Sequence, residues 1–208
     1  MWPFRYRIEA LIAGSALVVL SPLLAAIALA IRISSPGPVL YMADRAGLRG
    51  ARFRMYKFRT MYVAAAGSRI AAPGDPRIFP LGRWLRRFRL DELPQLINIV
   101  RGEMAFVGPR PEDPWIVEHH YTGADRETLN VLPGLTSPGT LSYCKDVEPH
   151  LERHGAEAAY ISGPLRRKLD LDRAWIRDRS AAVDLRLAIR TIFVVAGFIK
   201  KWDSRGNS

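Results

Sequence analysis

The sequence predicts an α+β fold: a re-entrant membrane segment over residues 1–34, followed by one compact domain over residues 35–208. Three observations lead to this prediction. Residues 10–31 contain no charged side chain, residues 39–58 have the pattern of two short strands around a turn, and several later segments have helical periodicity. A length of 208 residues suffices for one domain with small appendages.

The uncharged run from Ala10 to Ile31 is long enough to span a bilayer, which requires roughly 20 apolar residues. Ser21-Pro22 lies in its middle, and a proline there removes a backbone hydrogen bond and bends a helix. Each arm then measures roughly 16 Å, about half of the hydrocarbon thickness. Arginines flank both ends, and the positive-inside rule keeps both ends cytoplasmic. A re-entrant helix-break-helix with the break at Ser21 and Pro22 is favoured, and a straight span is the alternative.

After the apolar run, the sequence predicts a β-hairpin. Ser34–Pro38 is a breaker cluster that ends the membrane segment. Residues 39–42 and 53–58 have strand character, and a glycine-containing turn at residues 46–50 lies between them. Apolar and basic side chains alternate in the second strand, so we expect part of it to face a core: Phe53, Met55 and Phe58.

Amphipathic and interfacial helices are predicted around this hairpin. Pro94 suits the first turn of a short helix that ends near residue 101, and two longer helices are predicted over residues 165–179 and 183–202. The last one ends in Lys200-Lys201-Trp202, which fits a membrane-interface helix, with a core helix as the alternative. Residues 81–90 fit an amphipathic helix whose apolar residues we expect to be buried: Trp84, Leu85 and Phe88.

An acidic pair, Asp91-Glu92, lies inside one of the most basic stretches of the chain. Asp and Glu hold Mg²⁺ through oxygen, usually together with a phosphate substrate, and arginines bind phosphate oxygens in paired hydrogen bonds. The predicted helix start at Pro94 places the pair at a helix N-terminus, where carboxylates are stabilised and phosphate is attracted. A solvated, charged helix face is the alternative interpretation of this segment alone.

The amino-acid composition limits the classes of molecule that the protein is expected to bind. Lysine and arginine number 31 against 20 acidic residues, a formal charge of +11, which favours polyanions such as anionic lipid headgroups, phosphorylated small molecules or nucleic acid. The single cysteine, Cys144, excludes an internal disulfide and indicates a reducing, cytoplasm-facing location. The four histidines lack the spacing of zinc ligands. Arg110 lies between two prolines, which restrict the backbone and aim its guanidinium.

A set of short motifs, in this order and spacing, resembles the bacterial sugar transferase family, the small monotopic phosphoglycosyl transferases. The resemblance covers roughly residues 5–200, nearly the whole chain. The loop after Pro133–Thr136 departs from many relatives, so the resemblance leaves the choice of sugar open. The matching motifs are Ser21-Pro22, Ser35–Pro38, Lys57–Met61, Asp75–Arg77, Gly82-Arg83, Leu90–Gln95, Val107–Pro111 and Pro133–Thr136.

The resemblance implies a Mg²⁺-dependent transferase at the bacterial inner membrane, monotopic, with its catalytic domain facing the cytoplasm. Such enzymes move a phosphosugar from a UDP-sugar to polyprenol (undecaprenyl) phosphate in the inner leaflet, giving polyprenol-diphosphate-sugar and UMP. This is the first membrane step of a bacterial glycan pathway. The oligomeric state stays open.

The resemblance also assigns roles to residues. Asp91 falls on the family's nucleophile, which carries a covalent aspartyl-phosphosugar, and Glu92 falls on its acidic neighbour; both would hold Mg²⁺. Candidate phosphate or substrate contacts are Lys57, Arg59, Arg86, Arg110, Arg87 as a substitute for Arg86, and Asp172 in a C-terminal region that also resembles the family.

Two non-enzymatic alternatives are a nucleic-acid-binding protein and a basic scaffold that docks on lipid. The apolar run argues against a soluble nucleic-acid binder, and an acidic pair inside the basic patch would repel phosphate without a metal. A lipid-docking scaffold leaves Asp91, Glu92 and Arg110 without a purpose. We therefore expect no nucleic-acid partner, and the transferase is the favoured prediction.

Overall fold

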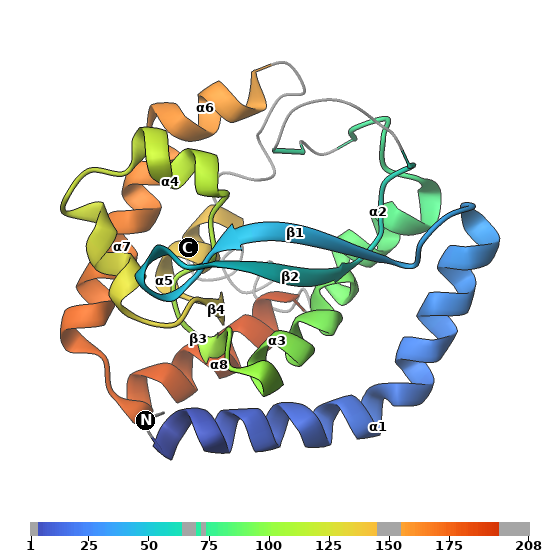
Figure 1. Cartoon of the computed structure of the whole chain (residues 1–208), viewed down its shortest axis with the longest axis horizontal. Coiled ribbons are helices and arrows are strands. Elements are labelled where there is room, and N and C mark those ends of the chain that lie inside the picture. The colour runs from blue at the N-terminus through green and yellow to red at the C-terminus, as the bar shows by residue number, and fades with distance from the viewer. Residues whose placement is uncertain (1–3, 64–69, 72–73, 145–154, 196–208) are drawn as a thin grey trace, which may run out of the picture.

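The computed structural model describes residues 4–63, 70–71, 74–144 and 155–195. It is a mixed helical and sheet fold, as predicted, in which one long helix borders a domain with two small sheets (Figure 1). The elements are α1 (Phe4–Ser34), β1 (Leu40–Ala46), η1 (Leu48–Gly50), β2 (Arg52–Phe58), α2 (Pro80–Arg87), η2 (Leu90–Gln95), α3 (Leu96–Arg101), β3 (Ala105–Val107), α4 (Pro114–His120), η3 (Asp125–Asn130), β4 (Gly134–Thr136), α5 (Pro138–Ser142), α6 (Ala156–Ser162), α7 (Pro164–Asp178) and α8 (Ala181–Val195).

Helix α1 is continuous through the predicted break and changes direction partway along its length (Figure 1). Proline has no backbone N–H, so Pro22 leaves the carbonyl of Val18, four residues earlier, without its helical donor. The Ser21 hydroxyl donates to that same carbonyl at 2.7 Å. The Ser-Pro pair therefore bends the helix while keeping its hydrogen bonding satisfied, and the break is a bend rather than an interruption.

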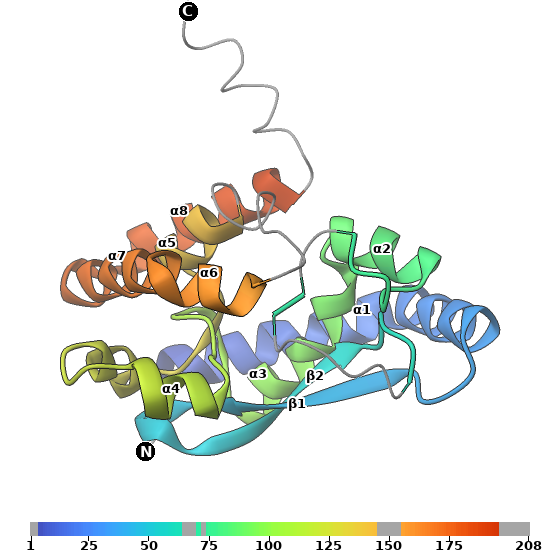
Figure 2. The same ribbon diagram turned by 90° about the horizontal axis from the view of Figure 1, so that it is seen from above.

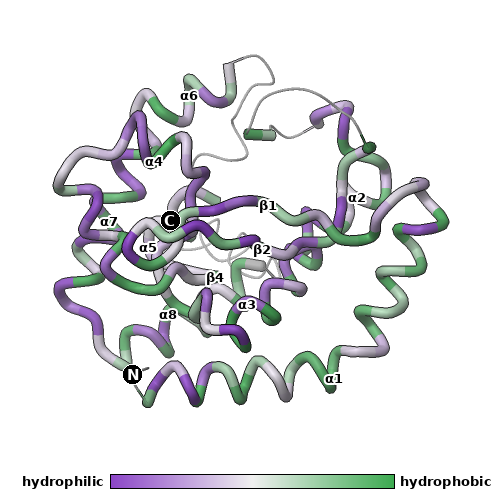
Figure 3. Tube along the Cα trace, viewed as in Figure 1, coloured by the Kyte–Doolittle hydropathy of each residue, from purple (hydrophilic) through white to green (hydrophobic). Residues whose placement is uncertain are grey.

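Most of α1 presents apolar side chains to the surroundings of the protein. Val18 and Val19 are 74% and 76% exposed, and the tube in Figure 3 is largely hydrophobic beyond the first turns of the helix. Among the described residues, α1 is the one helix long and apolar enough to cross a membrane. Exposed apolar surface of this extent marks a membrane or protein contact.

Both arms of α1 pack against the domain. In the first arm, Ala13 is fully buried in a cluster with Leu96 and Ile99 of α3. In the second arm, Ile31 is fully buried in a separate cluster with Phe79 and Leu85. Figure 2 shows α5, α7 and α8 in one layer and the β1–β2 hairpin in the opposite layer, with α3 between them; α1 lies at an intermediate depth and, in Figure 1, along the edge of the domain. The bend thus allows one helix to border two sides of the same domain.

The predicted hairpin is confirmed. Strands β1 and β2 pair antiparallel from Leu40 opposite Phe58 to Ala46 opposite Arg52. The first strand is longer than predicted, and Met55 and Phe58 are buried as expected, with Phe53 partly buried. Asn98 of α3 joins this hairpin to the helix layer: its amide oxygen accepts from Tyr56 N at 3.0 Å, and its amide nitrogen donates to Arg54 O at 2.7 Å.

The expected burial on α2 is wrong for two of three residues. Leu85 is 1% exposed, but Trp84 and Phe88 are 52% and 38% exposed. Their rings contact each other, with centroids 4.9 Å apart. Periodicity identified an apolar face correctly, but α1 and the hairpin cover only the part of it around Leu85.

A second sheet brings two loops of the domain together. Strands β3 and β4 pair in parallel, with Ala105 opposite Gly134 and Val107 opposite Thr136. The chains approach so closely that a Cβ on Gly134 would lie 2.2 Å from Gly108 N. Only glycine fits this contact, which places the Pro109–Pro111 turn beside the start of β4.

The C-terminal helices partly match the predictions. Helix α7 confirms the helix expected over residues 165–179, and α8 confirms the first part of the helix expected over residues 183–202; Lys200-Lys201-Trp202 lie outside the described residues. Asp184 of α8 accepts from Trp175 Nε1 at 2.8 Å and pairs with Arg5 Nη1 at 2.5 Å, which ties α7 and α8 to the start of α1. An apolar stripe of α8 is exposed: Leu185, Ile189, Ile192 and Phe193.

Candidate functional site

The acidic pair lies in the first turn of the 3₁₀ helix η2, which runs directly into α3. The sequence placed the pair ahead of a helix that starts at Pro94; the structure starts the helical backbone four residues earlier. Arg89, immediately before η2, has a positive φ of 54° and ends the path of α2. This sharp change of direction turns Asp91 and Glu92 toward strand β2.

Glu92 lies among three cationic side chains. Arg110 makes a paired contact, with Nη1 donating to Oε2 at 3.2 Å and Nη2 donating to Oε1. Lys57 Nζ donates to Oε1 at 3.2 Å, and Arg89 Nη1 lies 3.5 Å from the same oxygen. The Glu92 side chain is 11% exposed, so these charges interact in a poorly solvated environment where ion pairs are strong.

Asp91 is also buried, at 6% exposed, but its surroundings differ. Its Oδ1 atom has no hydrogen-bond partner among the described residues. A buried polar atom without a partner costs free energy and is rare in folded proteins. An unpartnered carboxylate oxygen next to a cluster of cations has the chemistry required of a nucleophile or of a metal ligand.

The surroundings shift the pKa values of the two carboxyl groups in opposite directions. Burial raises the pKa of Asp91 above its ordinary value, and the Glu92 charge raises it further. Burial also favours a higher pKa for Glu92, but the charges of Arg110 and Lys57 outweigh it and hold that pKa well below its usual range. Burial lowers the pKa of Lys57, with Glu92 opposing. The negative charge is thus fixed on Glu92, while the charge of Asp91 depends on what binds beside it.

Three further elements supply the cations. Lys57 comes from the end of β2, Arg110 from the proline-flanked turn after β3, and Arg89 from the connection between α2 and η2. Arg86 of α2 donates to Thr60 Oγ1 at 2.8 Å, and its charge lowers the pKa of Asp91. The structure thus brings together four predicted site residues and one that was not predicted: Asp91, Glu92, Lys57, Arg110 and, as the addition, Arg89.

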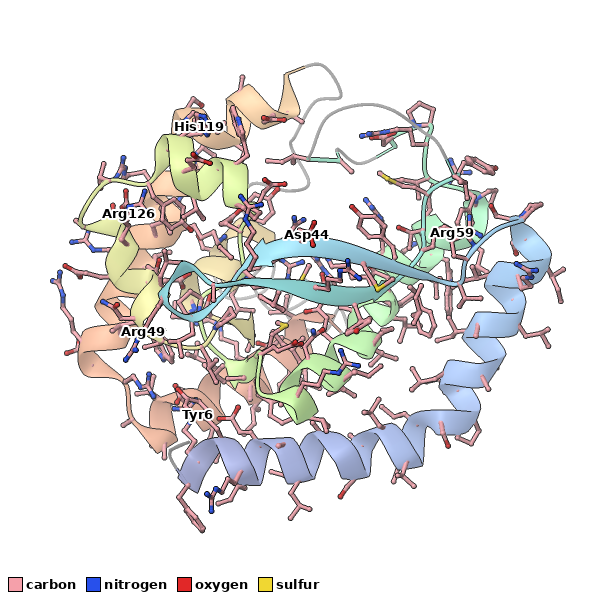
Figure 4. All side chains as sticks on the ribbon, in the orientation of Figure 1. Tyr6, Asp44, Arg49, Arg59, His119 and Arg126 are labelled. Atoms are coloured by element: carbon pink, nitrogen blue, oxygen red, sulfur yellow. The ribbon has the colours of Figure 1, made fainter. Side chains whose placement is uncertain are left out.

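Arg59 lies outside this cluster. Its guanidinium donates to Pro38 O at 2.5 Å, to Ser35 Oγ at 2.7 Å and to Ser35 O at 2.6 Å, and the residue is 5% exposed. Figure 4 shows Arg59 near the junction of α1 and β1, at the end of the hairpin away from its tip. In the structure, the hydrogen bonds of Arg59 therefore hold the breaker cluster, Ser34–Pro38, in place after α1.

Arg87 and Asp172 also lie apart from the pair. Arg87 is exposed on α2, with its guanidinium 5.8 Å from the ring centre of Phe88. Asp172 is fully buried in α7, and its Oδ1 accepts from Gly139 N at 2.8 Å. Asp172 thus holds the start of α5 against α7.

A cavity of about 110 Å³ opens from the cationic cluster. Lys57 and Arg110 line it, and so does a buried group consisting of Glu112, Tyr160 and Lys168. Lys168 Nζ and the Tyr160 hydroxyl both donate to Glu112 Oε1. Sequence reasoning missed this group, although Glu112 follows directly on the Arg110-Pro111 motif.

The burial of Asp172 makes stability depend on pH. Burial raises its pKa to about 6, against the opposing charge of Lys168. Because the pKa is higher in the folded than in the unfolded chain, this effect favours folding below about pH 4 and is lost as pH rises through 6. In the parent, the unfolding free energy should therefore fall by about 3 kcal/mol between about pH 4 and pH 6, and in Asp172→Asn this fall should be absent. Thermal melts of detergent-solubilised protein at pH 4 to 8 check this.

The control for that experiment is Asp170→Asn, two residues earlier on the same helix. Its carboxylate is exposed and contacts Arg173 at 3.3 Å. Asparagine at 172 keeps an oxygen that can accept from Gly139 N, so a variant that lost stability equally at every pH would contradict the assigned titration.

The chain is similar to known proteins over most of its length. A family model described as bacterial sugar transferase matches residues 3–197. The chain is 33% identical over 189 residues to the UDP-glucose:undecaprenyl-phosphate glucose-1-phosphate transferase of Escherichia coli K12, covering 89% of this chain and 38% of that protein. It is 36% identical over 194 residues to the protein of the same name from Caulobacter vibrioides, covering 90% and 68%.

A third relative is the UDP-N-acetylgalactosamine-undecaprenyl-phosphate N-acetylgalactosaminephosphotransferase of Aeromonas hydrophila, 33% identical over 194 residues, which are 91% of this chain and 43% of the relative. The chain thus spans less than half the length of the E. coli and A. hydrophila proteins. The family match nonetheless runs from the start of α1 to the end of α8 and includes every residue of the site. The chain therefore belongs to the bacterial sugar transferase family.

Proposed function

We propose that this chain is an enzyme that transfers a phosphosugar from a UDP-sugar to undecaprenyl phosphate, giving undecaprenyl-diphosphate-sugar and UMP. The observation that carries the proposal is the division between the two carboxylates. Glu92 is held by Arg110, Lys57 and Arg89, whereas Asp91 keeps a buried oxygen without a partner beside the same cations. The names of the relatives, which specify UDP-sugars and undecaprenyl phosphate, support it.

The chemistry we assign has two steps. In the first, an Asp91 carboxylate oxygen attacks the β-phosphorus of the UDP-sugar; the bond from that phosphorus to the bridging oxygen breaks and UMP leaves. In the second, a phosphate oxygen of undecaprenyl phosphate attacks the same phosphorus, and the bond to Asp91 breaks. The carboxylate of Asp91 is thereby restored. Lys57 and Arg110 stabilise the negative charge on the transferred phosphate oxygens in both steps.

Magnesium is part of this proposal. Among the described residues, no group of three or more His, Cys, Asp or Glu side chains is placed to hold a metal ion. Mg²⁺ commonly relies on one or two carboxylates and takes its remaining ligands from water and substrate phosphates. The free Asp91 oxygen fits this donor set. Glu92 would join it as a ligand by exchanging part of its contact with Arg110 or Lys57 for the metal ion. Bound there, Mg²⁺ would neutralise charge on the diphosphate.

The proposal is tested by measuring UMP release in detergent from a panel of UDP-sugars, with and without undecaprenyl phosphate. We expect UMP release with at least one sugar and its loss on addition of EDTA, restored by Mg²⁺. Incubation without the lipid acceptor should add one phosphosugar to the intact protein mass. A protein that releases no UMP with any sugar, or that binds nucleic acid or vesicles alone, contradicts the transferase proposal.

We further propose that α1 enters and leaves the bilayer on the same, cytoplasmic side of the bacterial inner membrane. Its start pairs with Asp184 through Arg5, and Glu9 accepts from Phe106 N at 2.7 Å. Its end leads into the breaker cluster before β1, where Arg32 Nη1 donates to Gly37 O at 2.7 Å, and Ile31 of the last turns is fully buried in the cluster with Phe79 and Leu85. A straight span would carry one end away from the domain, whereas these contacts hold both ends on it.

Exposed apolar groups extend this membrane surface beyond α1. Trp84 and Phe88 of α2 and the apolar stripe of α8 are suited to the headgroup region, where tryptophan and amphipathic helices are favoured. A peptide tag before Met1 and one after Ser208, tested with protease on sealed inside-out vesicles, should both be cleaved. Protection of the N-terminal tag alone would establish a straight span instead.

A further inference from the structure

The cavity between the cationic cluster and Glu112 is built for a ligand. Its lining includes Lys57 and Arg110, which contact Glu92. Met55 and Ile116 supply apolar walls, and Tyr143 supplies an aromatic one. Pockets that combine apolar and aromatic walls with a few fixed polar groups are typical of small-molecule sites.

The cavity lining also includes a buried polar group, Glu112, Tyr160 and Lys168. Tyr160 is 4% exposed and Lys168 is 3% exposed, and both donate to Glu112 Oε1. Two donors on one oxygen fix the orientation of the carboxylate, and a carboxylate oxygen can accept more than one hydrogen bond. A buried, charge-assisted network of this kind holds its members in one geometry, which a site needs in order to distinguish one arrangement of hydroxyl groups from another.

We propose that this cavity holds the sugar ring of the nucleotide sugar, and that the Tyr160–Glu112–Lys168 group determines which sugar is accepted. The inference rests on the proposed function and extends it to the substrate. The sugar is joined to the β-phosphorus through a single oxygen, so it must lie directly beside the groups that bind that phosphate. Lys57 and Arg110 are those groups, and they line the cavity.

Size and chemistry favour the sugar over the nucleoside. Pockets for drug-sized ligands measure roughly 300–1,000 Å³, so a cavity of about 110 Å³ suits one ring and not the two rings of uridine. Sugar hydroxyls can donate to the Glu112 carboxylate or to the Tyr160 oxygen, whose own hydrogen goes to Glu112, and can accept from the Lys168 ammonium; the apolar face of the ring can lie on Tyr143. The α-phosphate separates the uridine from the β-phosphate, so the uridine would have to bind outside this cavity.

The test compares ligand binding in a background in which the first chemical step is blocked. Asp91→Asn protein in detergent micelles, with and without the added change Tyr160→Phe, is titrated calorimetrically with UDP-glucose, UDP-galactose, their two N-acetylated counterparts and UMP. Tyr160→Phe removes one hydroxyl and keeps the ring. We expect the ratio of Kd values between the best and worst sugar to change by about tenfold, the value of one hydrogen bond, with the Kd of UMP unchanged within about twofold.

Tyr121→Phe is the matched control. Tyr121 packs in the same core cluster as Tyr160 but is not among the residues that line this cavity, so the ratio should stay as in the parent. A second variant, Tyr143→Leu, removes the half-buried aromatic wall and should weaken every UDP-sugar while leaving UMP unchanged.

The outcomes separate this inference from the proposed function. A uniform loss for all sugars together with weaker UMP binding would place uridine in the cavity and overturn the inference, and so would unchanged Kd values in both cavity variants. Selective changes in sugar binding support it. If sugar binding responds as expected but the parent with Asp91 releases no UMP, then the transferase proposal fails and the sugar site stands.

Discussion

Asp91→Asn is expected to lower UMP release by a factor on the order of 10⁴ or more, because the variant lacks the oxygen nucleophile of the first step. The amide has almost the same shape as the carboxylate, so substrate binding should be retained. The variant should also fail to take up a phosphosugar when incubated with UDP-sugar alone. UMP release and intact protein mass measure these two expectations on the same sample.

The same substitution is expected to leave the fold intact or to stabilise it. Asp91 Oδ1 has no partner, and burial raises the pKa of the carboxyl, so the charged form is costly in the folded state. Replacing it with a neutral amide removes that cost, and the melting temperature should rise or stay the same. A gain in stability combined with a loss of activity is the signature of a residue kept for chemistry.

Asp44→Asn provides the control. Asp44 is an exposed carboxylate on β1, labelled in Figure 4, and it lies outside the cationic cluster. This variant should keep both activity and melting temperature. Turnover retained in Asp91→Asn would rule out Asp91 as the nucleophile, and an acceptor-independent adduct on that variant would locate the covalent step at another residue.

Local patterns predicted the elements of this fold well. The hairpin, α3 and α7 follow from alternation, a proline at a helix start and amphipathic spacing, which are properties of short segments. Burial was predicted less well, as Trp84 and Phe88 illustrate. Periodicity reports that a helix has an apolar face, but whether protein or membrane covers that face depends on packing between distant segments.

The site depended on contacts that no single segment encodes. Glu92 meets Arg110, which is 18 residues away in the chain, and Lys57, which is 35 residues away. Composition suggested that arginines near the acidic pair would bind phosphate, yet Arg89 reaches Glu92 because its own backbone adopts a positive φ. The Glu112–Lys168 pair joins residues 56 positions apart and left no local pattern to find.

The clearest contrast is between two arginines that the sequence treated alike. Arg110 is aimed at Glu92 by a rigid turn and lines the cavity, whereas Arg59 is enclosed by backbone carbonyls and a serine hydroxyl. Arg59 belongs to the motif Lys57–Met61 and Arg110 to the motif Val107–Pro111, and both were predicted to contact phosphate. The number and kind of protein acceptors around each guanidinium distinguish Arg110, which we propose binds phosphate, from Arg59, which holds the segment after α1.

Arg110→Ala is therefore expected to lower kcat/KM by about 10² to 10³, the usual cost of removing one charged group that stabilises developing negative charge. Its effect on the melting temperature should be smaller than that of Arg59→Ala, because Lys57 and Arg89 still contact the Glu92 carboxylate. Arg59→Ala is expected to do the reverse. It leaves buried carbonyls such as Ser35 O without a donor, which should cost about 3 kcal/mol of unfolding free energy.

Arg101→Ala is the control for these two variants, because Arg101 lies outside both the cationic cluster around Glu92 and the breaker cluster held by Arg59. Arg101 is exposed and contacts the Tyr56 ring, with 5.0 Å to the ring centre, so its loss should change neither quantity. Steady-state UMP release and the thermal shift of intrinsic tryptophan fluorescence, measured on the three variants under one set of conditions, separate the roles. If Arg59→Ala melts like the parent but loses turnover, then Arg59 contacts the phosphate, as the sequence predicted. An Arg110→Ala protein with full turnover would remove Arg110 from it.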